Sequence, residues 1–309
     1  MKKTFLIIVA ILMLSNAFGQ KVETIFLDKT DKTKNCYTII YPAKLPYKGF
    51  LCLIPGFGET ADQISQQTSL HQLAAQNGIL TIIPTFNDGV LSFGIDPASQ
   101  QSLVNILDHA SNKLQLSALR FFIGGFSIGG SAAIKYAEDA TAKNLKIKPS
   151  LIFAIDPPLD FERFYYSAKR DVRLSVNSAP SQENVYMIKR IEEVMGGTPA
   201  SAIENYYSIS PYSFNDQSQQ AIKKLVNTPL RIYSEPDVNW WINERKSDFS
   251  AMNVLDCSAM INELNRLGNA KAQLITTTNK GFRKPENRRH PHSWSIVKND
   301  ELIAWLLAE

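Results

Sequence analysis

The feature that most constrains the fold is the segment spanning residues 119–137, LRFFIGGFSIGGSAAIKYA. Its first part is an apolar run typical of a strand buried on both faces, and its last part is a run of small residues typical of a helix packed closely on a sheet. Ser127 lies between them, with Gly125 and Gly129 where side chains would obstruct a tight turn. Such a strained turn lifts a hydroxyl clear of the backbone beside a helix N-terminus, so Ser127 is the candidate nucleophile.

The chain on either side alternates apolar β-type runs with segments of helical spacing. We expect a leading hairpin over 22–44, then strands at 49–54, 79–84, 119–126, 150–155, 230–234 and 272–277. We expect helices at 62–77, 98–116, 129–141 and 255–267, and a last helix that starts near Asn299. This alternation predicts an α/β fold with a mostly parallel central sheet flanked by helices.

One long segment, roughly 157–225, interrupts the alternation. It contains FERFYY, a stretch of helical spacing near 184–195, a Gly-Gly pair and IENYYSISPYSF. We interpret it as a helical cap or lid inserted into a single α/β domain that spans residues 20–309.

The N-terminus has the pattern of a secretory signal peptide. Lys2 and Lys3 precede the apolar run from Phe5 to Leu14, and small residues follow, with expected cleavage after Ala17 or Gly19. The run is too short to span a bilayer, and no cysteine at its end favours a lipid anchor. We therefore predict that residues 1–19 are a signal peptide and that the protein is exported, periplasmic or secreted, without a membrane anchor after cleavage.

The composition argues against several classes of partner. The formal charge of +4 falls to +2 once Lys2 and Lys3 are removed, so nothing favours binding to nucleic acid or to a membrane surface. Cys36, Cys52 and Cys257 have no metal-like spacing, and the sequence leaves open whether Cys36 and Cys257 form a disulfide.

A serine nucleophile needs a base and an acid that orients the base. The chain has four histidines. His71 and His109 precede Ser127 in predicted helices, where surface positions are expected. His290 and His292 follow it in RRHPHSWS, a loop between the last predicted strand and the last helix. Two acids end predicted strands between the serine and this loop: Asp237 after 230–234 and Asp156 after 150–155, with Glu235 and Asp160 as weaker candidates.

The mechanism also needs two backbone N–H groups to stabilise negative charge on the substrate oxygen. Ile128, directly after the serine, is expected to supply one. Phe57, in the loop PGFGET after the strand 49–54, is expected to supply the other. This loop also fits the dinucleotide pattern G-x-G-x-x-A, but the next predicted strand ends at Pro84 instead of an acidic residue, which argues against a nucleotide cofactor.

Together these segments resemble the α/β-hydrolase superfamily, in particular its secreted esterase-like members, over most of residues 45–309. The resemblance rests on the PGFG loop, the G-x-S-x-G turn, the position of Asp237 and the segment His292-Ser293-Trp294. It differs in having Pro55 where a histidine often stands. It implies a catalytic triad of Ser127, Asp237 and His292, with His290 and Asp156 as alternatives, and acyl transfer that needs no cofactor and no metal.

Aromatic residues are frequent in the segments expected to border the site. We predict that Trp240, Trp241, Trp294 and Tyr207 bind substrate, because aromatic rings with polar tips stack on sugars and aryl groups. The expected substrate is a small-molecule or carbohydrate ester, including acyl or feruloyl esters of carbohydrates. Two alternatives remain open: a serine peptidase or amidase on the same fold, and a catalytically inactive binding protein.

Overall fold

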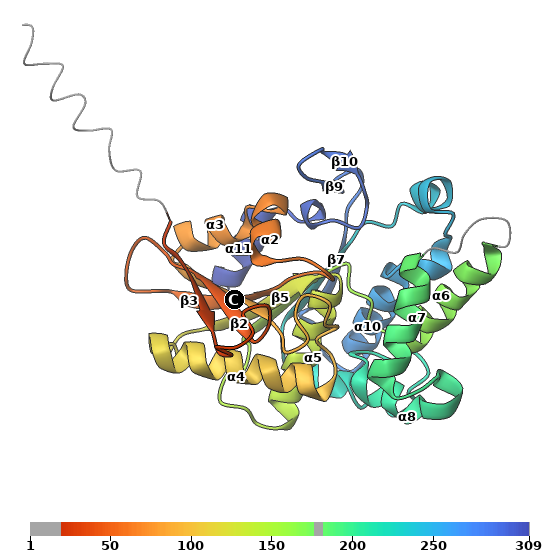
Figure 1. Cartoon of the computed structure of the whole chain (residues 1–309), viewed down its shortest axis with the longest axis horizontal. Coiled ribbons are helices and arrows are strands. Elements are labelled where there is room, and N and C mark those ends of the chain that lie inside the picture. The colour runs from red at the N-terminus through yellow and green to blue at the C-terminus, as the bar shows by residue number, and fades with distance from the viewer. Residues whose placement is uncertain (1–19, 176–181, 309) are drawn as a thin grey trace, which may run out of the picture.

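An eight-stranded sheet forms the centre of the protein (Figure 1). The structure is a computed structural model that describes residues 20–175 and 182–308, so the predicted signal peptide lies outside the described residues. The strands are β1 (Val22–Phe26), β2 (Cys36–Ile40), β3 (Gly49–Ile54), β4 (Ile79–Thr85), β5 (Phe121–Phe126), β6 (Leu151–Ile155), β7 (Leu230–Ser234) and β8 (Ala272–Thr276).

The strand order is β1-β2-β4-β3-β5-β6-β7-β8. β1 pairs antiparallel with β2, as expected for the leading hairpin. β2 also pairs antiparallel with β4, and every pair from β4 to β8 is parallel. β3, β5 and β6 consist entirely of buried residues, which agrees with their unbroken apolar sequences. The predicted mostly parallel α/β sheet is therefore confirmed.

Helices cover both faces of this sheet (Figure 1). One face packs on α4 (Pro97–Leu114), α5 (Ile128–Ala142) and α10 (Val254–Arg266), and the other on α2 (Ala61–Gln67), α3 (Leu70–Gln76) and α11 (Asn299–Ala308). The helix expected over 62–77 is broken in two, because Thr68 adopts an extended conformation at the end of α2. Within the described residues no helix is both long and apolar enough to cross a membrane.

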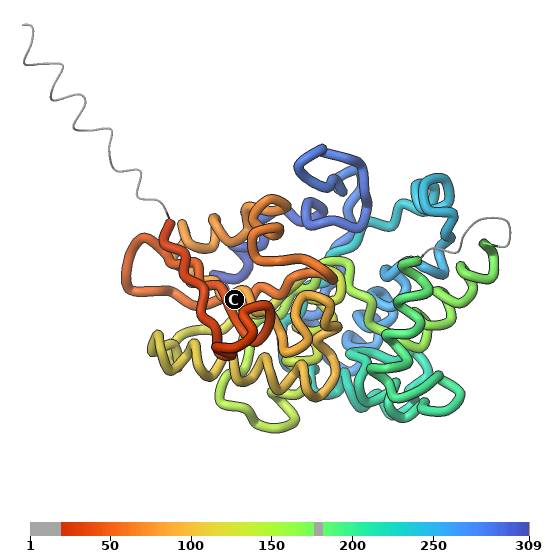
Figure 2. The backbone as a smooth tube through the Cα atoms, viewed as in Figure 1, coloured from red at the N-terminus to blue at the C-terminus, as the bar shows by residue number. Residues whose placement is uncertain are grey.

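The chain between β6 and β7 forms a separate lobe, the green and cyan part of the tube beside the sheet in Figure 2. It contains α6 (Phe161–Leu174), α7 (Gln182–Met195) and α8 (Pro199–Ile209), followed by the short helix η1 (Ile222–Leu225). α6, α7 and α8 share a hydrophobic core that also includes Ile128 at the start of α5. The lobe is thereby packed against the carboxyl ends of the central strands.

The loops at the carboxyl edge of the sheet, after β7 and β8, contain several short elements. After β7 come α9 (Val238–Trp240), η2 (Trp241–Arg245) and η3 (Phe249–Ala251); after β8 come the hairpin β9 (Phe282–Arg283) and β10 (Arg288–Arg289) and then η4 (Trp294–Ile296). The hairpin and η2 were not anticipated from the sequence. All three cysteines are buried and free, so Cys36 and Cys257 form no disulfide.

Candidate active site

Ser127 lies at a sharp turn between β5 and α5. Its backbone has φ 53° and ψ −126°, in the region that favours glycine, which is the strained conformation expected of an exposed nucleophile. A Cβ on Gly125 would lie 2.5 Å from the carbonyl oxygen of Ile54, and one on Gly129 would lie 2.2 Å from that of Pro55. The two flanking glycines are therefore required by the close approach of the turn to the end of β3.

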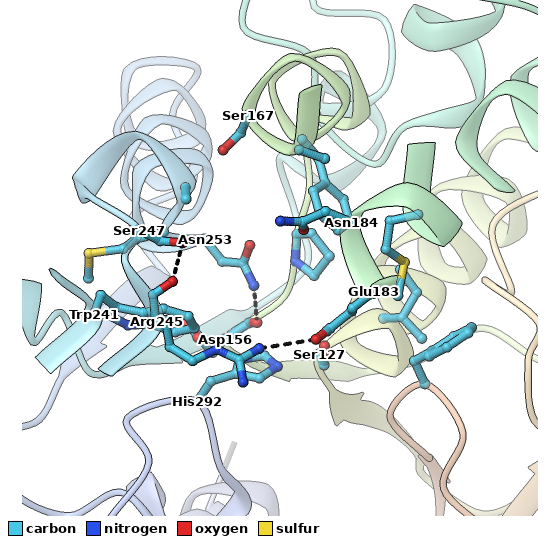
Figure 3. A pocket seen from close by; sticks show the side chains of 18 of the residues that line it. Ser127, Asp156, Ser167, Glu183, Asn184, Trp241, Arg245, Ser247, Asn253 and His292 are labelled. Atoms are coloured by element: carbon cyan, nitrogen blue, oxygen red, sulfur yellow. Dashed lines mark hydrogen bonds and ion pairs between the residues drawn. The ribbon is translucent and has the colours of Figure 1, made fainter. Parts of the chain in front are cut away.

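His292 is held beside this turn by contacts on two sides. Its Nδ1 hydrogen-bonds Oδ2 of Asp156 at 2.7 Å, and its ring packs on that of Phe126, next to Ser127, with the centroids 4.5 Å apart. With Nδ1 bound to the carboxylate, Nε2 is the nitrogen free to exchange protons with a hydroxyl. Figure 3 draws Ser127, His292 and Asp156 together in one pocket.

Asp156 is held in place by hydrogen bonds from neighbouring residues. It follows β6 directly and has φ 47°. Ser234, the last residue of β7, donates its hydroxyl to Oδ1 at 2.6 Å, which leaves Oδ2 for His292. Asn253 donates its side-chain amide to the backbone carbonyl of Asp156 at 2.9 Å, and the backbone N–H of Asp156 donates to Tyr233.

Asp237, the acid that the sequence favoured, does not contact His292. Its Oδ2 pairs with Nη2 of Arg289 at 2.7 Å, and its Oδ1 accepts the backbone N–H of Trp240 at the start of α9. The partner of His292 is instead Asp156, the alternative from the sequence. Ser234, the last residue of β7, donates its hydroxyl to Asp156, whereas the carboxylate of Asp237 is held further along the chain by Arg289 and by the start of α9.

The weaker acid candidates also have structural partners. Glu235 pairs with Nη1 of Arg289 at 2.6 Å and accepts the backbone N–H groups of Lys280 and Gly281. Asp160 accepts the backbone N–H of Arg163 at the start of α6, and burial raises the pKa of its carboxyl to about 6. Neither carboxylate bonds His292 in the described part of the chain.

The two proposed N–H donors border the same pocket. Ile128 is the first residue of α5, a position whose backbone N–H has no partner within the helix. Phe57 lies in the turn after β3, where the N–H of Glu59 donates to the carbonyl of Gly56. The geometry thus brings the segments of both candidate donors to Ser127.

Glu59 connects this turn to the histidine loop, a role that the sequence did not suggest. Its Oε2 accepts the backbone N–H of Gly56 at 2.8 Å, and both of its oxygens lie within 3.2 Å of Nε1 of Trp294. Burial raises the pKa of the Glu59 carboxyl, although these hydrogen bonds and the neighbouring His292 oppose the shift. One carboxylate therefore ties the loop PGFGET after β3 to the segment that carries His292.

His290, the alternative base, is buried behind His292. Its ring lies against Trp240, with centroids 4.6 Å apart, and against Trp241 at 5.9 Å. Burial and the nearby guanidinium of Arg283 lower the pKa of His290 to about 2. This histidine stays neutral over the physiological range and packs against the tryptophans instead of contacting Ser127.

Two of the four aromatic residues predicted to bind substrate line the pocket, and two do not. A cavity of about 790 Å³ holds Ser127 and His292, and Trp241 and Trp294 line it, whereas Trp240 and Tyr207 do not. Trp294 is nearly fully buried, so most of its surface packs on the protein. Phe57, Phe93 and Phe164 line the cavity as well.

The described residues contain no group of three or more His, Cys, Asp or Glu side chains arranged to hold a metal ion. A strained serine beside a histidine that is oriented by an aspartate is the arrangement used for nucleophilic attack on carbonyl groups.

Comparison with known sequences gives no family for this chain. No protein-family model matches the sequence, and no curated protein matches it.

Solved structures, by contrast, match over nearly the whole chain. Carboxyl esterase 2 of the fungus Tuber melanosporum is 13% identical, with a TM-score of 0.58, over 93% of this chain and 84% of that one. An S-formylglutathione hydrolase from Agrobacterium tumefaciens is 15% identical, with a TM-score of 0.55, over 94% and 96%. The fluorophosphonate-binding serine hydrolase F of Staphylococcus aureus is 13% identical, with a TM-score of 0.52, over 94% and 99%.

These matches, together with the sheet order and the turn at Ser127, show that the chain has the α/β-hydrolase fold. The fold that the sequence resemblance implied is thereby confirmed. At such low identity the neighbours establish the fold and leave the reaction to be argued from the site.

Proposed function

We propose that this protein is a serine hydrolase that cleaves carboxylic esters through an acyl-enzyme on Ser127. The observation that carries the proposal is the 2.7 Å hydrogen bond from Nδ1 of His292 to Asp156, in the pocket that also contains the strained serine. A glycine-flanked serine in a positive-φ turn costs stability, and such strain is typically retained at functional sites.

In the first half of the reaction, Nε2 of His292 removes the proton of the Ser127 hydroxyl while Oγ attacks the ester carbonyl carbon. Asp156 holds the imidazole in the required tautomer and stabilises its protonated form. The carbonyl oxygen becomes negatively charged and accepts hydrogen bonds from the backbone N–H groups of Ile128 and Phe57. The carbon–oxygen bond to the alcohol then breaks, and His292 protonates the departing alcohol.

In the second half, His292 removes a proton from a water molecule, which attacks the acyl-serine carbonyl. The acid product leaves when the bond to Oγ breaks and His292 returns the proton to Ser127. Every step is a proton transfer or a substitution at the carbonyl carbon, so no oxidant or reductant takes part.

We further propose that the protein acts outside the cytoplasm on small-molecule or carbohydrate esters. Export rests on the signal-peptide pattern of residues 1–19. The size of the cavity, about 790 Å³, suits a substrate of drug-like or monosaccharide size, and Trp241 offers a partly exposed ring within it. Esters of sugars, including feruloyl esters, are the first natural substrates to assay.

The decisive experiment compares the purified protein with its Ser127→Ala variant on p-nitrophenyl acetate. We expect the variant to lose activity by several orders of magnitude and to lose labelling by a fluorophosphonate, because both require Oγ. A Ser65→Ala variant, in which an exposed serine of α2 is changed, serves as the matched control. Equal rates for Ser127→Ala and wild type, without fluorophosphonate labelling of either, would instead favour a binding protein.

A further inference from the structure

Two arginines from different elements line the pocket that holds Ser127 and His292. Arg245 ends η2, after β7, and Arg283 lies in β9 of the hairpin after β8. Two guanidinium groups that border one cavity repel each other, and an anion bound near both offsets this repulsion. Their common position therefore points to the charge of the molecule that enters.

Arg283 has no carboxylate partner within ion-pair distance in the described residues. Its Nε and Nη2 both donate to the backbone carbonyl oxygen of His292, at 3.2 and 3.1 Å, which fixes one edge of the guanidinium and leaves Nη1 available. Burial and the neighbouring Arg245 lower the pKa of Arg283. The protein thus holds a positive charge beside His292 with no carboxylate in direct contact, while the charges of Glu59 and Glu183 attract it from further away.

Arg245 does have an ion-pair partner, but one that is easily displaced. Its Nη2 lies 3.0 Å from Oε2 of Glu183, near the start of α7 in the inserted lobe, and the dashed line in Figure 3 joins the two side chains. The side chains of Arg245 and Glu183 are 39% and 60% exposed, and pairs exposed to this extent contribute little to stability. An anion bound in the cavity could replace Glu183 at low cost.

The acidic side chains that line the cavity are mostly engaged elsewhere. Glu235 pairs with Arg289, Glu59 accepts hydrogen bonds from Gly56 and Trp294, and Asp171 accepts the hydroxyl of Ser247. Of the remaining charges, Glu244 and Lys246 flank Arg245 on the exposed turn of η2 and offset each other. Asp156 bonds His292. These carboxylates keep their negative charges, so an anion is favoured at the hairpin by the N–H donors of Arg283 and by the displaceable ion pair of Arg245, and not by an excess of positive charge in the cavity.

We propose that the pocket selects esters that carry a carboxylate, which binds Arg283 and takes the place of Glu183 on Arg245. This inference rests on the proposed ester hydrolysis and names its substrate class. A carboxylate suits two guanidinium groups because each offers planar, paired N–H donors. The reacting ester bond then lies at Ser127 while the anionic end of the substrate remains at the hairpin.

The test uses three p-nitrophenyl esters with six-carbon acyl chains that differ in terminal charge: the anionic hemiadipate, the neutral hexanoate and the cationic 6-aminohexanoate. The readout is the ratio of kcat/KM on the anionic ester to that on the neutral ester. We expect this ratio to fall about tenfold or more in Arg283→Gln and in Arg245→Gln, because each removes a charged hydrogen-bond donor. The ratio cancels any effect on folding or on the triad that is common to both substrates.

Two further variants sharpen the test. Glu183→Gln removes the competing carboxylate and should raise the ratio, opposite in direction to the arginine variants. Lys284→Gln removes a positive charge from the same hairpin, but its Nζ bonds Asn287 and it does not line the cavity, so the ratio should stay at the wild-type value. High salt should lower the ratio in the wild type, since the side chains of the pair are partly exposed.

Two outcomes overturn the inference: an unchanged ratio in both arginine variants, or a wild-type preference for the cationic ester. Failure of the proposed function gives a different result, in which none of the three esters is hydrolysed and a fluorophosphonate does not label the protein. Hydrolysis of the neutral ester by the wild type separates the two cases.

Discussion

Exchanging the two candidate acids for their amides separates the roles of Asp156 and Asp237. In Asp156→Asn the amide preserves size but can no longer hold the His292 ring in the tautomer that leaves Nε2 unprotonated, nor stabilise the protonated ring. Loss of an orienting aspartate at such a site lowers kcat by about 10⁴, or about 5 kcal/mol of transition-state stabilisation.

Asp237→Asn should cost far less. The change removes a partly exposed ion pair with Arg289, worth about 0–1 kcal/mol, and the amide oxygen can still accept the backbone N–H of Trp240. We therefore expect kcat to change by less than about fivefold, since Asp237 has no contact with His292.

The assay is hydrolysis of p-nitrophenyl acetate by both variants, with thermal unfolding followed by circular dichroism to verify that each is folded. A rate ratio of about 10³ or more between Asp237→Asn and Asp156→Asn is the expected result. The reasoning is refuted if both folded variants lose activity to the same extent, or if Asp156→Asn retains nearly all of it.

Two further predictions concern the side chains that support the site. Glu59→Gln leaves one acceptor oxygen for two donors, the backbone N–H of Gly56 and Nε1–H of Trp294. We therefore expect the free energy of unfolding to fall by about 1–3 kcal/mol and kcat to fall with it. Urea titration and p-nitrophenyl acetate kinetics measure the two quantities, and unchanged values would contradict the link between the loops. Burial lowers the pKa of His290 from 6.5 to about 2, so the unfolded chain takes up a proton below pH 6.5 that the folded protein excludes, and stability falls as the pH decreases through this window. Between about pH 7.5 and about pH 5 the wild type should lose up to about 2 kcal/mol more than His290→Asn in urea unfolding, and equal losses in both proteins would rule out this linkage.

The central elements of the fold could be predicted because their signals are local. Strand β5 and helix α5 follow from an apolar run and a small-residue run around Ser127, and the observed bounds differ from the expected ones by one or two residues. The helix expected at 62–77 was wrong at one point, because its spacing continues across Thr68 while the backbone there is extended. The hairpin of β9 and β10 was missed, since two-residue strands carry no periodic pattern.

The two histidines that lie in helices, His71 and His109, also show what the sequence could not predict. His71 and His109 lie in predicted helices, where the sequence favoured surface positions for both; His109 is exposed and bonds the hydroxyl of Tyr37, but His71 is buried. Which face of a helix meets the sheet depends on packing that a single residue does not reveal.

The sequence by itself predicted the turn at Ser127, because a glycine on each side of the serine, between an apolar run and a small-residue run, is a local signal. The structure adds that side chains at Gly125 and Gly129 would collide with the end of β3. The sequence also limited the base to the loop that contains His290 and His292. Only the tertiary structure decided that Asp156 orients His292, that Glu59 joins two loops and that Arg245 and Arg283 border one cavity. The residues of each pair are far apart in the chain, and several of them lie at the end of a strand or just after it. Which of them make contact therefore depends on the directions of their side chains at the edge of the sheet. That direction depends on the three-dimensional packing of the loops, which no local pattern encodes.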